Sequence, residues 1–415
     1  MAASFRFSKV LNTLLQPNFG VYVAGNATSL IGTWMHRIAS GWLVWEMTGS
    51  AAWLGVIAFA DLFPAVLIAP FAGVAADRWE RLPVMKLAQV LGALISGLLA
   101  LLFFTGNLTI WGLLGITVLL GSVDAFVQPF RLALVSALVA REDLTSAVAL
   151  KSITFNLARF VGPAVAGVVI VTAGVGWAFV INAFSFLALL AALQFVRVLQ
   201  PQVRQKSREA SVLRDALEGA RYAMGAPGVG LVLLLLAATC FTGRPVVELL
   251  PGWAGEIFAG TASDLAALTS AIGIGAVIGG LWLAGRPSTR GLVKAFLACC
   301  FGLVASVTAF ALASSTIVAL PLMVVAGFFL VSSAICAQTM VQLNVADEMR
   351  GRVLSLYAII LRGGPAVGAL LMGFVAESVG LRAPQIIGML LLFLATLAML
   401  SRRREMEAAL EGGES

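Results

Sequence analysis

Several ionised side chains lie inside long apolar stretches of this chain, where a charge is costly. Three of them are the carboxylates Asp61, Asp124 and Glu248. A carboxyl group buried away from arginines can load and release a proton, so these three are candidates for proton coupling. Four arginines occupy similar positions: Arg37, Arg159, Arg244 and Arg362. Each charge could equally belong to a structural ion pair, because pairing alone makes a buried charge tolerable.

The sequence lacks the patterns that enzymes, metal sites and ATP-driven pumps require. It has no Gly-x4-Gly-Lys-Ser/Thr loop to hold nucleotide phosphates, and no Ser/His/Asp or Cys/His arrangement. The single His36 cannot form a histidine metal cluster. The four cysteines fall in apolar stretches without metal-site spacing, as expected for packing residues. We therefore expect no enzymatic activity, no metal and no cofactor.

Composition places these charges in a membrane protein, since 60% of the 415 residues are apolar and only 11% are charged. A helix needs about 20 apolar residues to cross a bilayer, and such segments recur throughout the chain. The expected spans are 20–45, 51–75, 83–105, 109–131, 146–171, 174–196, 228–252, 264–284, 290–313, 316–340, 352–376 and 380–401. The predicted fold class is thus all-α integral membrane, with twelve transmembrane helices.

The basic residues test this count, because Lys and Arg collect in cytoplasmic connections. Most of the 27 basic residues fall on alternate connections, while Arg382 lies in a loop of the opposite side. We therefore expect a multi-pass protein of the bacterial inner membrane with both termini cytoplasmic. The net charge of +7 has the same origin, so we expect no nucleic-acid partner.

Weak repetition divides the chain into two related halves. Gly162-Pro163-Ala164-Val165 in the fifth span matches Gly364-Pro365-Ala366-Val367 in the eleventh, and each follows an arginine, Arg159 or Arg362. We expect a six-helix bundle over 1–200, a cytoplasmic linker over 201–227 and a second bundle with a short tail over 228–415. The linker has apolar residues on one helical face, which indicates a short amphipathic helix on the membrane surface, although a solvated flexible linker is the alternative.

The connection after the second span reads Gly-Val-Ala-Ala-Asp-Arg-Trp-Glu-Arg over residues 73–81. It resembles the signature loop of the major facilitator superfamily, with matches at Gly73, Asp77, Arg78 and Arg81. Glu80 replaces a glycine of that pattern and Leu82 replaces a basic residue. The resemblance implies two pseudo-symmetric six-helix bundles, and it implies that this loop acts as a conformational latch on the cytoplasmic side.

Further resemblance covers most of the chain and points to the exporter branch that includes enterobactin and macrolide exporters. It includes Gly32-Thr33-Trp34-Met35 near the first span and Pro129-x-Arg131 at the fourth. Gly162-Pro163-x-x-Ala166-Gly167 is similar to the antiporter motif of the superfamily, with Ala166 in place of a glycine. We expect this motif, which includes Pro163 and Gly167, and its counterpart at Gly364 and Pro365 to allow close helix packing or bending.

The function expected from these features is secondary active transport. The resemblance places helices one, four, seven and ten around a central cavity, so Arg37, Asp124, Arg244 and Glu248 are the candidate cavity residues. We expect a monomeric, proton-coupled exporter of small amphipathic molecules such as drugs or siderophores, which works in the lipid bilayer by rocking of the two bundles. The alternatives are a lipid or lysolipid translocator and a non-transporting receptor or scaffold with the same fold.

Overall fold

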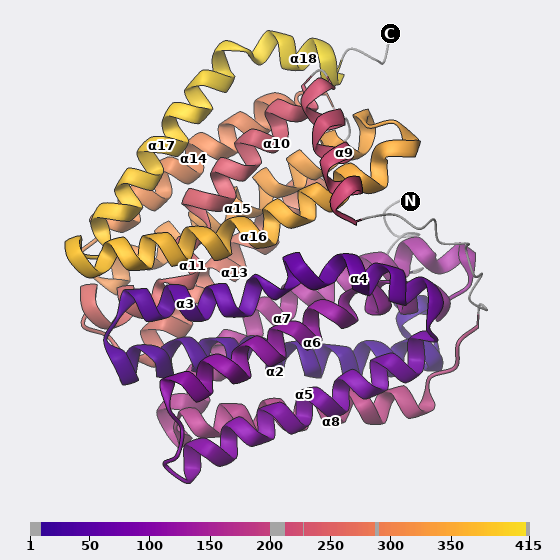
Figure 1. Cartoon of the computed structure of the whole chain (residues 1–415), viewed down its shortest axis with the longest axis vertical. Helices are drawn as coiled ribbons and strands as arrows, with labels where there is room; N and C mark the ends of the chain where they lie inside the picture. The colour runs from indigo at the N-terminus through magenta and orange to yellow at the C-terminus, as the bar shows by residue number, and fades with distance from the viewer. Residues whose placement is uncertain (1–9, 200–211, 227, 287–289, 412–415) are drawn as a thin grey trace. The chain divides into compact units, whose positions relative to one another are not determined.

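The structure is a computed structural model that describes residues 10–199, 212–226, 228–286 and 290–411 (Figure 1). In these ranges the chain forms helices and short connections, without any strand. Residues 1–9 and 200–211, which hold part of the expected N-terminal and linker segments, lie outside the described residues.

Helices occupy each of the first six expected spans. They are α2 (Pro17–Thr48), α3 (Ala51–Leu62) with α4 (Pro64–Arg78), α5 (Arg81–Phe104), α6 (Ile110–Ala137), α7 (Leu144–Ala173) after the short turn η1 (Arg141–Asp143), and α8 (Val175–Phe195). The second span is divided because Pro64 has no N–H for the preceding turn, so one helix ends at Leu62 and the next begins at Pro64.

The second half begins with a strongly interrupted span. It consists of α10 (Val229–Ala238), the π-helix η2 (Thr239–Gly243), α11 (Pro245–Glu248), α12 (Leu250–Gly252) and the π-helix η3 (Trp253–Ile257). Neither Pro245 nor Pro251 can donate a backbone hydrogen bond, which disrupts the regular α-helical pattern. The other five spans are continuous: α13 (Ala262–Ala284), α14 (Leu292–Leu312), α15 (Thr316–Asn344), α16 (Asp347–Val379) and α17 (Arg382–Ser401).

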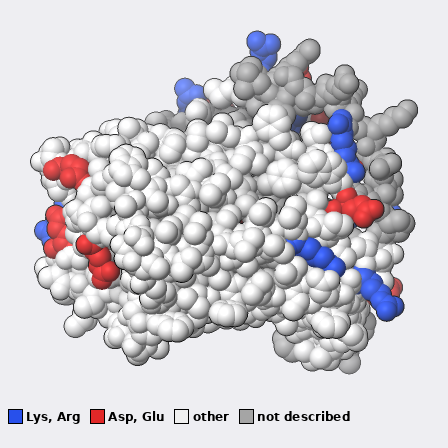
Figure 2. All heavy atoms as spheres, turned by 60° about the horizontal axis from the view of Figure 1, so that its bottom comes forward, with Lys and Arg blue, Asp and Glu red and all other residues white. Residues whose placement is uncertain are grey.

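Eleven of the spans in the described part of the chain are long and apolar enough to cross a membrane. The remaining one, α2, has the length for it with 32 residues. It carries His36, Arg37 and Glu46 among its apolar residues. Leucines spaced along α5 are exposed, and Figure 2 shows a face covered mostly by uncharged residues. Such a surface fits lipid better than water.

One compact unit consists of residues 1–43 and 64–208. Its helices approach closely at small residues: a Cβ on Gly25 would lie 2.5 Å from Ala192 Cβ, and a Cβ on Gly32 would lie 2.1 Å from Ser185 Oγ. Both contacts join α2 to α8. An apolar core that includes Phe19 from α2 lies at one end of this unit.

The other compact unit consists of residues 44–63 and 209–415. Residues 44–63 belong by sequence to the first six spans, yet α3 packs against α16 here. Helices α13 and α15 pack backbone to backbone, since a Cβ on Gly275 would lie 1.8 Å from the Val324 carbonyl oxygen. Small residues thus set the helix spacing, as is common in membrane bundles.

Two short helices in this second unit lie outside the spans. Helix α9 (Val212–Gly225) falls in the segment where an amphipathic helix is expected, and its Glu218 forms a 2.9 Å ion pair with Arg352 of α16. Helix α18 (Arg403–Glu411) ends at Glu411, whose carboxylate accepts hydrogen bonds from the N–H groups of Gly291 and Val293 at 2.8 Å. This carboxylate therefore caps the start of α14.

Candidate functional site

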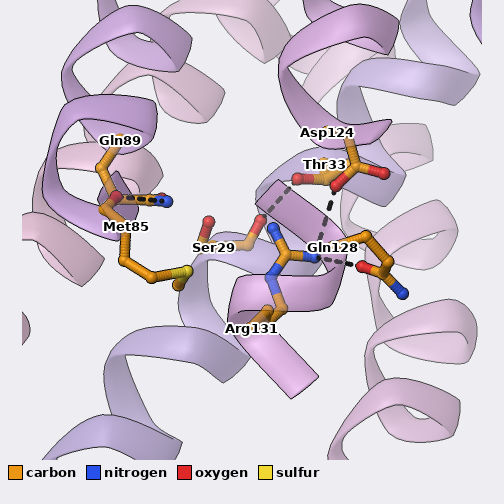
Figure 3. A network of polar contacts seen from close by, with 7 residues as sticks. All are labelled: Ser29, Thr33, Met85, Gln89, Asp124, Gln128 and Arg131. Atoms are coloured by element: carbon orange, nitrogen blue, oxygen red, sulfur yellow. Dashed lines mark hydrogen bonds and ion pairs between the residues drawn. The ribbon is translucent and has the colours of Figure 1, made fainter. Parts of the chain in front are cut away.

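A polar stripe on α6 is the best-defined candidate site (Figure 3). Asp124, Gln128 and Arg131 are spaced four and three residues apart, which places them on one helical face. Arg131 Nη1 lies 3.3 Å from Asp124 Oδ1 and 3.4 Å from Gln128 Oε1. The Arg131 side chain is 17% exposed and that of Asp124 is 42% exposed. The carboxylate is thus only partly covered by protein, while the guanidinium is mostly covered.

Polar residues from two neighbouring helices lie near this stripe. Thr33 Oγ1 of α2 donates a hydrogen bond to the Ser29 carbonyl at 2.9 Å, and Figure 3 shows both side chains beside Arg131. The buried Gln89 of α5 donates to the Met85 carbonyl at 3.3 Å. Helices α2, α5 and α6 therefore each contribute polar groups to this part of the first unit.

The arginines expected on the first and fifth spans meet at one aromatic ring. The guanidinium carbons of Arg37 and Arg159 lie 5.5 Å and 5.7 Å from the centre of the Trp34 ring. A cation over an aromatic face is stabilised by the charge distribution of the ring, which offsets part of the cost of desolvation. A Cβ on Gly162 would lie 2.5 Å from Trp34 Cβ, so α7 packs closely on α2 at this point.

The corresponding glycines of the second half make an equivalent contact. A Cβ on Gly364 of α16 would lie 2.8 Å from Cys240 Cβ, and one on Gly368 would lie 2.2 Å from the Phe241 carbonyl oxygen. The fifth span thus packs on the first, and the eleventh packs on the seventh, each at the glycine before a proline. Pro163 and Pro365 are both buried within their helices.

Arg244 and Glu248 lie in the interrupted seventh span. The Arg244 N–H donates to the Thr239 carbonyl at 3.2 Å, five residues back, which is the hydrogen bond of a π-helix. Such π-helical turns are frequent at functional sites, because they redirect side chains and loosen the helix. A Pro-interrupted span near a repeat boundary is also typical of transporter binding sites.

The four residues expected to form a latch lie on both sides of the short connection between α4 and α5: Gly73, Asp77 and Arg78 belong to the last turns of α4, and Arg81 begins α5. Arg81 Nη1 donates a hydrogen bond to the Ala133 carbonyl of α6 at 3.0 Å, and the adjacent Trp79 ring lies 5.9 Å from the Phe126 ring. Asp77 and Arg78 are exposed at the end of α4, and a Cβ on Gly73 would meet nothing within 4 Å. Contacts within the first unit therefore explain why an arginine is present at position 81, but they do not explain why a glycine is present at position 73.

The structure brings some of the predicted site residues together. Arg37, Arg159 and Gly162 surround Trp34, whereas Asp61 lies half-buried on α3 close to the break at Pro64. The pairing of Asp124 with Arg131 and Gln128 was not predicted, although the spacing along one helix would have indicated it. Within the described residues, no group of three or more His, Cys, Asp or Glu side chains could hold a metal ion.

Comparison with known proteins identifies transporters as relatives, two of them named for export or efflux. The staphyloferrin A transporter of Staphylococcus aureus is 24% identical over 85% of this chain and 87% of its own length. The enterobactin exporter EntS of Shigella boydii is 27% identical over 80% of this chain and 77% of its own. The macrolide efflux protein A of Streptococcus pyogenes is 24% identical over 86% of this chain and 89% of its own.

Solved structures share the fold. The nucleoside transporter NupG superposes with a TM-score of 0.71 at 14% identity, covering 93% of this chain and 99% of its own. A bacterial homolog of the human lysosomal transporter spinster gives 0.71 at 15% identity and covers 98% of both chains. These matches confirm the predicted major facilitator fold.

The family described as transmembrane secretion effector matches residues 9–413, almost the whole chain. This match confirms the resemblance to the exporter branch, and it confirms a transporter rather than an enzyme. The chain therefore belongs to the transmembrane secretion effector family of the major facilitator superfamily.

Proposed function

We propose that this protein is a secondary active exporter of small amphipathic molecules that uses an inward flow of protons. The relatives named for staphyloferrin A, enterobactin and macrolides support small-molecule export. The sequence offers no nucleotide-binding loop, so uphill transport requires an ion gradient. We further propose that the protein works as a monomer in the bacterial inner membrane. The distribution of its basic residues supports cytoplasmic termini.

The observation that carries the proton-coupling proposal is the contact between Asp124 and Arg131. The contact is long at 3.3 Å and the Asp124 carboxylate is only partly covered by protein, so in this proposal the contact breaks in every transport cycle. Protonation of Asp124 would remove its negative charge and release Arg131, which keeps Gln128 as an acceptor. The contact of Asp124 with Arg131 departs from the expectation that a proton carrier lies away from arginines, but Gln128 can take over as the acceptor of Arg131. Asp124 and Asp61 are thus the leading candidates for the proton carrier, with Glu248 third.

The cavity proposed from helices one, four, seven and ten includes Arg37, Asp124, Arg244 and Glu248. In this scheme Arg131 and Asp124 change partners when the proton binds, and Trp34 offers an aromatic surface near two cations. The π-helical segment around Arg244 gives the seventh span the flexibility that alternating access requires. An aromatic surface next to a few charges suits cargo that is partly apolar.

Transport by purified protein in liposomes tests this function. The probes are labelled enterobactin, labelled staphyloferrin A, a labelled macrolide and a fluorescent lysolipid, each with and without an imposed pH gradient. We expect one of the first three to accumulate against its gradient only when the pH gradient is present. Movement of the lysolipid alone would identify a lipid translocator, and binding without movement would identify a receptor.

A further inference from the structure

The N-terminus of α3 is held by a carboxylate from the far end of the chain. Glu377, two residues before the end of α16, accepts hydrogen bonds from Ser50 Oγ and, at 3.0 Å, from the Ala52 N–H. Ser50 is the N-cap of α3, and its Oγ also accepts the Trp53 N–H at 3.1 Å. A carboxylate is favoured here because the free N–H groups at a helix start carry partial positive charge.

Next to this contact, the backbones of α3 and α16 approach each other closely. A Cβ on Gly55 of α3 would lie 2.5 Å from the Ala369 carbonyl oxygen, and a Cβ on Gly373 of α16 would lie 2.4 Å from the Ala51 carbonyl oxygen. Ala369, Gly373 and Glu377 follow each other at four-residue intervals, so they share one face of α16. The carboxylate therefore lies at the end of a continuous close seam between α3 and α16.

This seam joins parts of the chain that belong to different sequence halves. Residues 44–63 lie within the first six spans, yet they form one compact unit with residues 209–415. The start of α3 and the end of α16 also lie at the ends of their spans that the basic residues predict to face outward. A protein that opens to both sides of the membrane in turn has to separate such a seam in one of its states.

We propose that Glu377 is the latch of an outer gate, which holds the start of α3 on α16 and releases it when the outward side opens. The inference rests on the alternating-access cycle proposed above. Glu377 is exposed at its helix end, so its hydrogen bonds compete with water and can be broken without a large penalty. The small residues of the seam let α3 and α16 pack closely in the closed gate. The Glu377 carboxylate adds polar contacts that stabilise this closed arrangement.

Cysteine labelling in lipid nanodiscs tests the latch. It needs no transported substrate, and the labelling reagent reaches both sides of the membrane. The four native cysteines, all buried, are replaced by serine or alanine, and Ala52→Cys supplies one half-buried thiol that keeps the backbone N–H. The maleimide reaction rate of this thiol is compared in the parent and in Glu377→Gln, Glu377→Ala and Ser50→Ala. Loss of a charge-assisted hydrogen bond should speed labelling by about five- to tenfold.

Asp264→Asn is the matched control. Asp264 also caps a helix start, accepting from the Thr261 N–H at 2.8 Å, but it belongs to the same helix, α13, that it caps. Its substitution should leave the labelling rate at Ala52→Cys unchanged. This variant controls for a general loosening of the protein when a helix-capping carboxylate is removed.

Each outcome decides the proposal. Faster labelling in the Glu377 and Ser50 variants, with Asp264→Asn at the parental rate, supports the latch. Equal rates in Glu377→Ala, Ser50→Ala and the parent, with monodisperse protein in all three, would overturn it. If proton-driven export fails while the labelling difference persists, the coupling proposal is wrong and the gate remains.

Discussion

Asp124 Oδ1 lies 3.3 Å from Arg131 Nη1, seven residues further along α6, and Gln128 Oε1 shares the same nitrogen at 3.4 Å. Two helical turns separate the charged residues, so both project from one face of the helix. Arg131 thereby has an ionisable partner and a neutral one. A proton on Asp124 would weaken the contact of Asp124 with Arg131 and leave Gln128 as the acceptor of Arg131. This exchange of partners could couple proton binding to a conformational change.

We predict that Asp124→Asn and Arg131→Gln each reduce transport driven by a pH gradient at least about tenfold. Their thermal unfolding midpoints should stay close to that of the parent, because the contact is long at 3.3 Å and the Asp124 carboxylate is only partly covered by protein. Asp347→Asn is the control, since Asp347 forms an exposed ion pair with Arg350 on α16. A large loss of thermal stability in Asp124→Asn would show that the pair is structural.

Gly162→Ala and Gly364→Ala should both destabilise the protein. The added methyl group would lie 2.5 Å from Trp34 Cβ in the first case and 2.8 Å from Cys240 Cβ in the second. Overpacking of this kind typically costs about 1–3 kcal/mol, which a lower unfolding temperature in detergent would reveal. Gly115→Ala on α6 is the control, because nothing lies within 4 Å of that position. Equal unfolding temperatures in all three variants would contradict the close contacts.

Asp77→Asn should slow transport without affecting expression or membrane insertion. Asp77 is exposed at the end of α4, so the first unit gains little from its charge, and its expected role is in the conformational cycle. Glu80→Gln, three residues further along in the connection between α4 and α5, should transport at the parental rate. Normal flux from a well-expressed Asp77→Asn protein would show that the loop acts only as a topology signal.

Single cysteines should report the predicted topology. Asn107→Cys in the connection between α5 and α6 should react with an impermeant thiol reagent added to intact cells, because that connection is expected outside. Ser207→Cys, which lies outside the described residues, should react only after the cells are opened. The reverse pattern would invert the orientation.

The sequence located the spans well because hydrophobic length alone determines whether a helix can cross a bilayer. It was less informative at helix ends. The fourth span is expected to end at residue 131, but α6 continues to Ala137. The predicted boundary therefore places Arg131 at the helix end, and not within the helix as the partner of Asp124. The contact of Glu377 with Ser50 joins residues 327 positions apart, and no local pattern in one sequence indicates such a pair.

Proton-driven flux in liposomes, measured in parallel for the parent, Asp61→Asn, Asp124→Asn and Glu248→Gln, tests the central claim most directly. The probe is whichever of the labelled siderophores or macrolide the parent accumulates. We predict that Asp124→Asn loses accumulation driven by the pH gradient but keeps downhill exchange, while at least one of the other two variants still accumulates the probe. Full pH-driven accumulation in all three variants would contradict proton coupling through a membrane carboxylate.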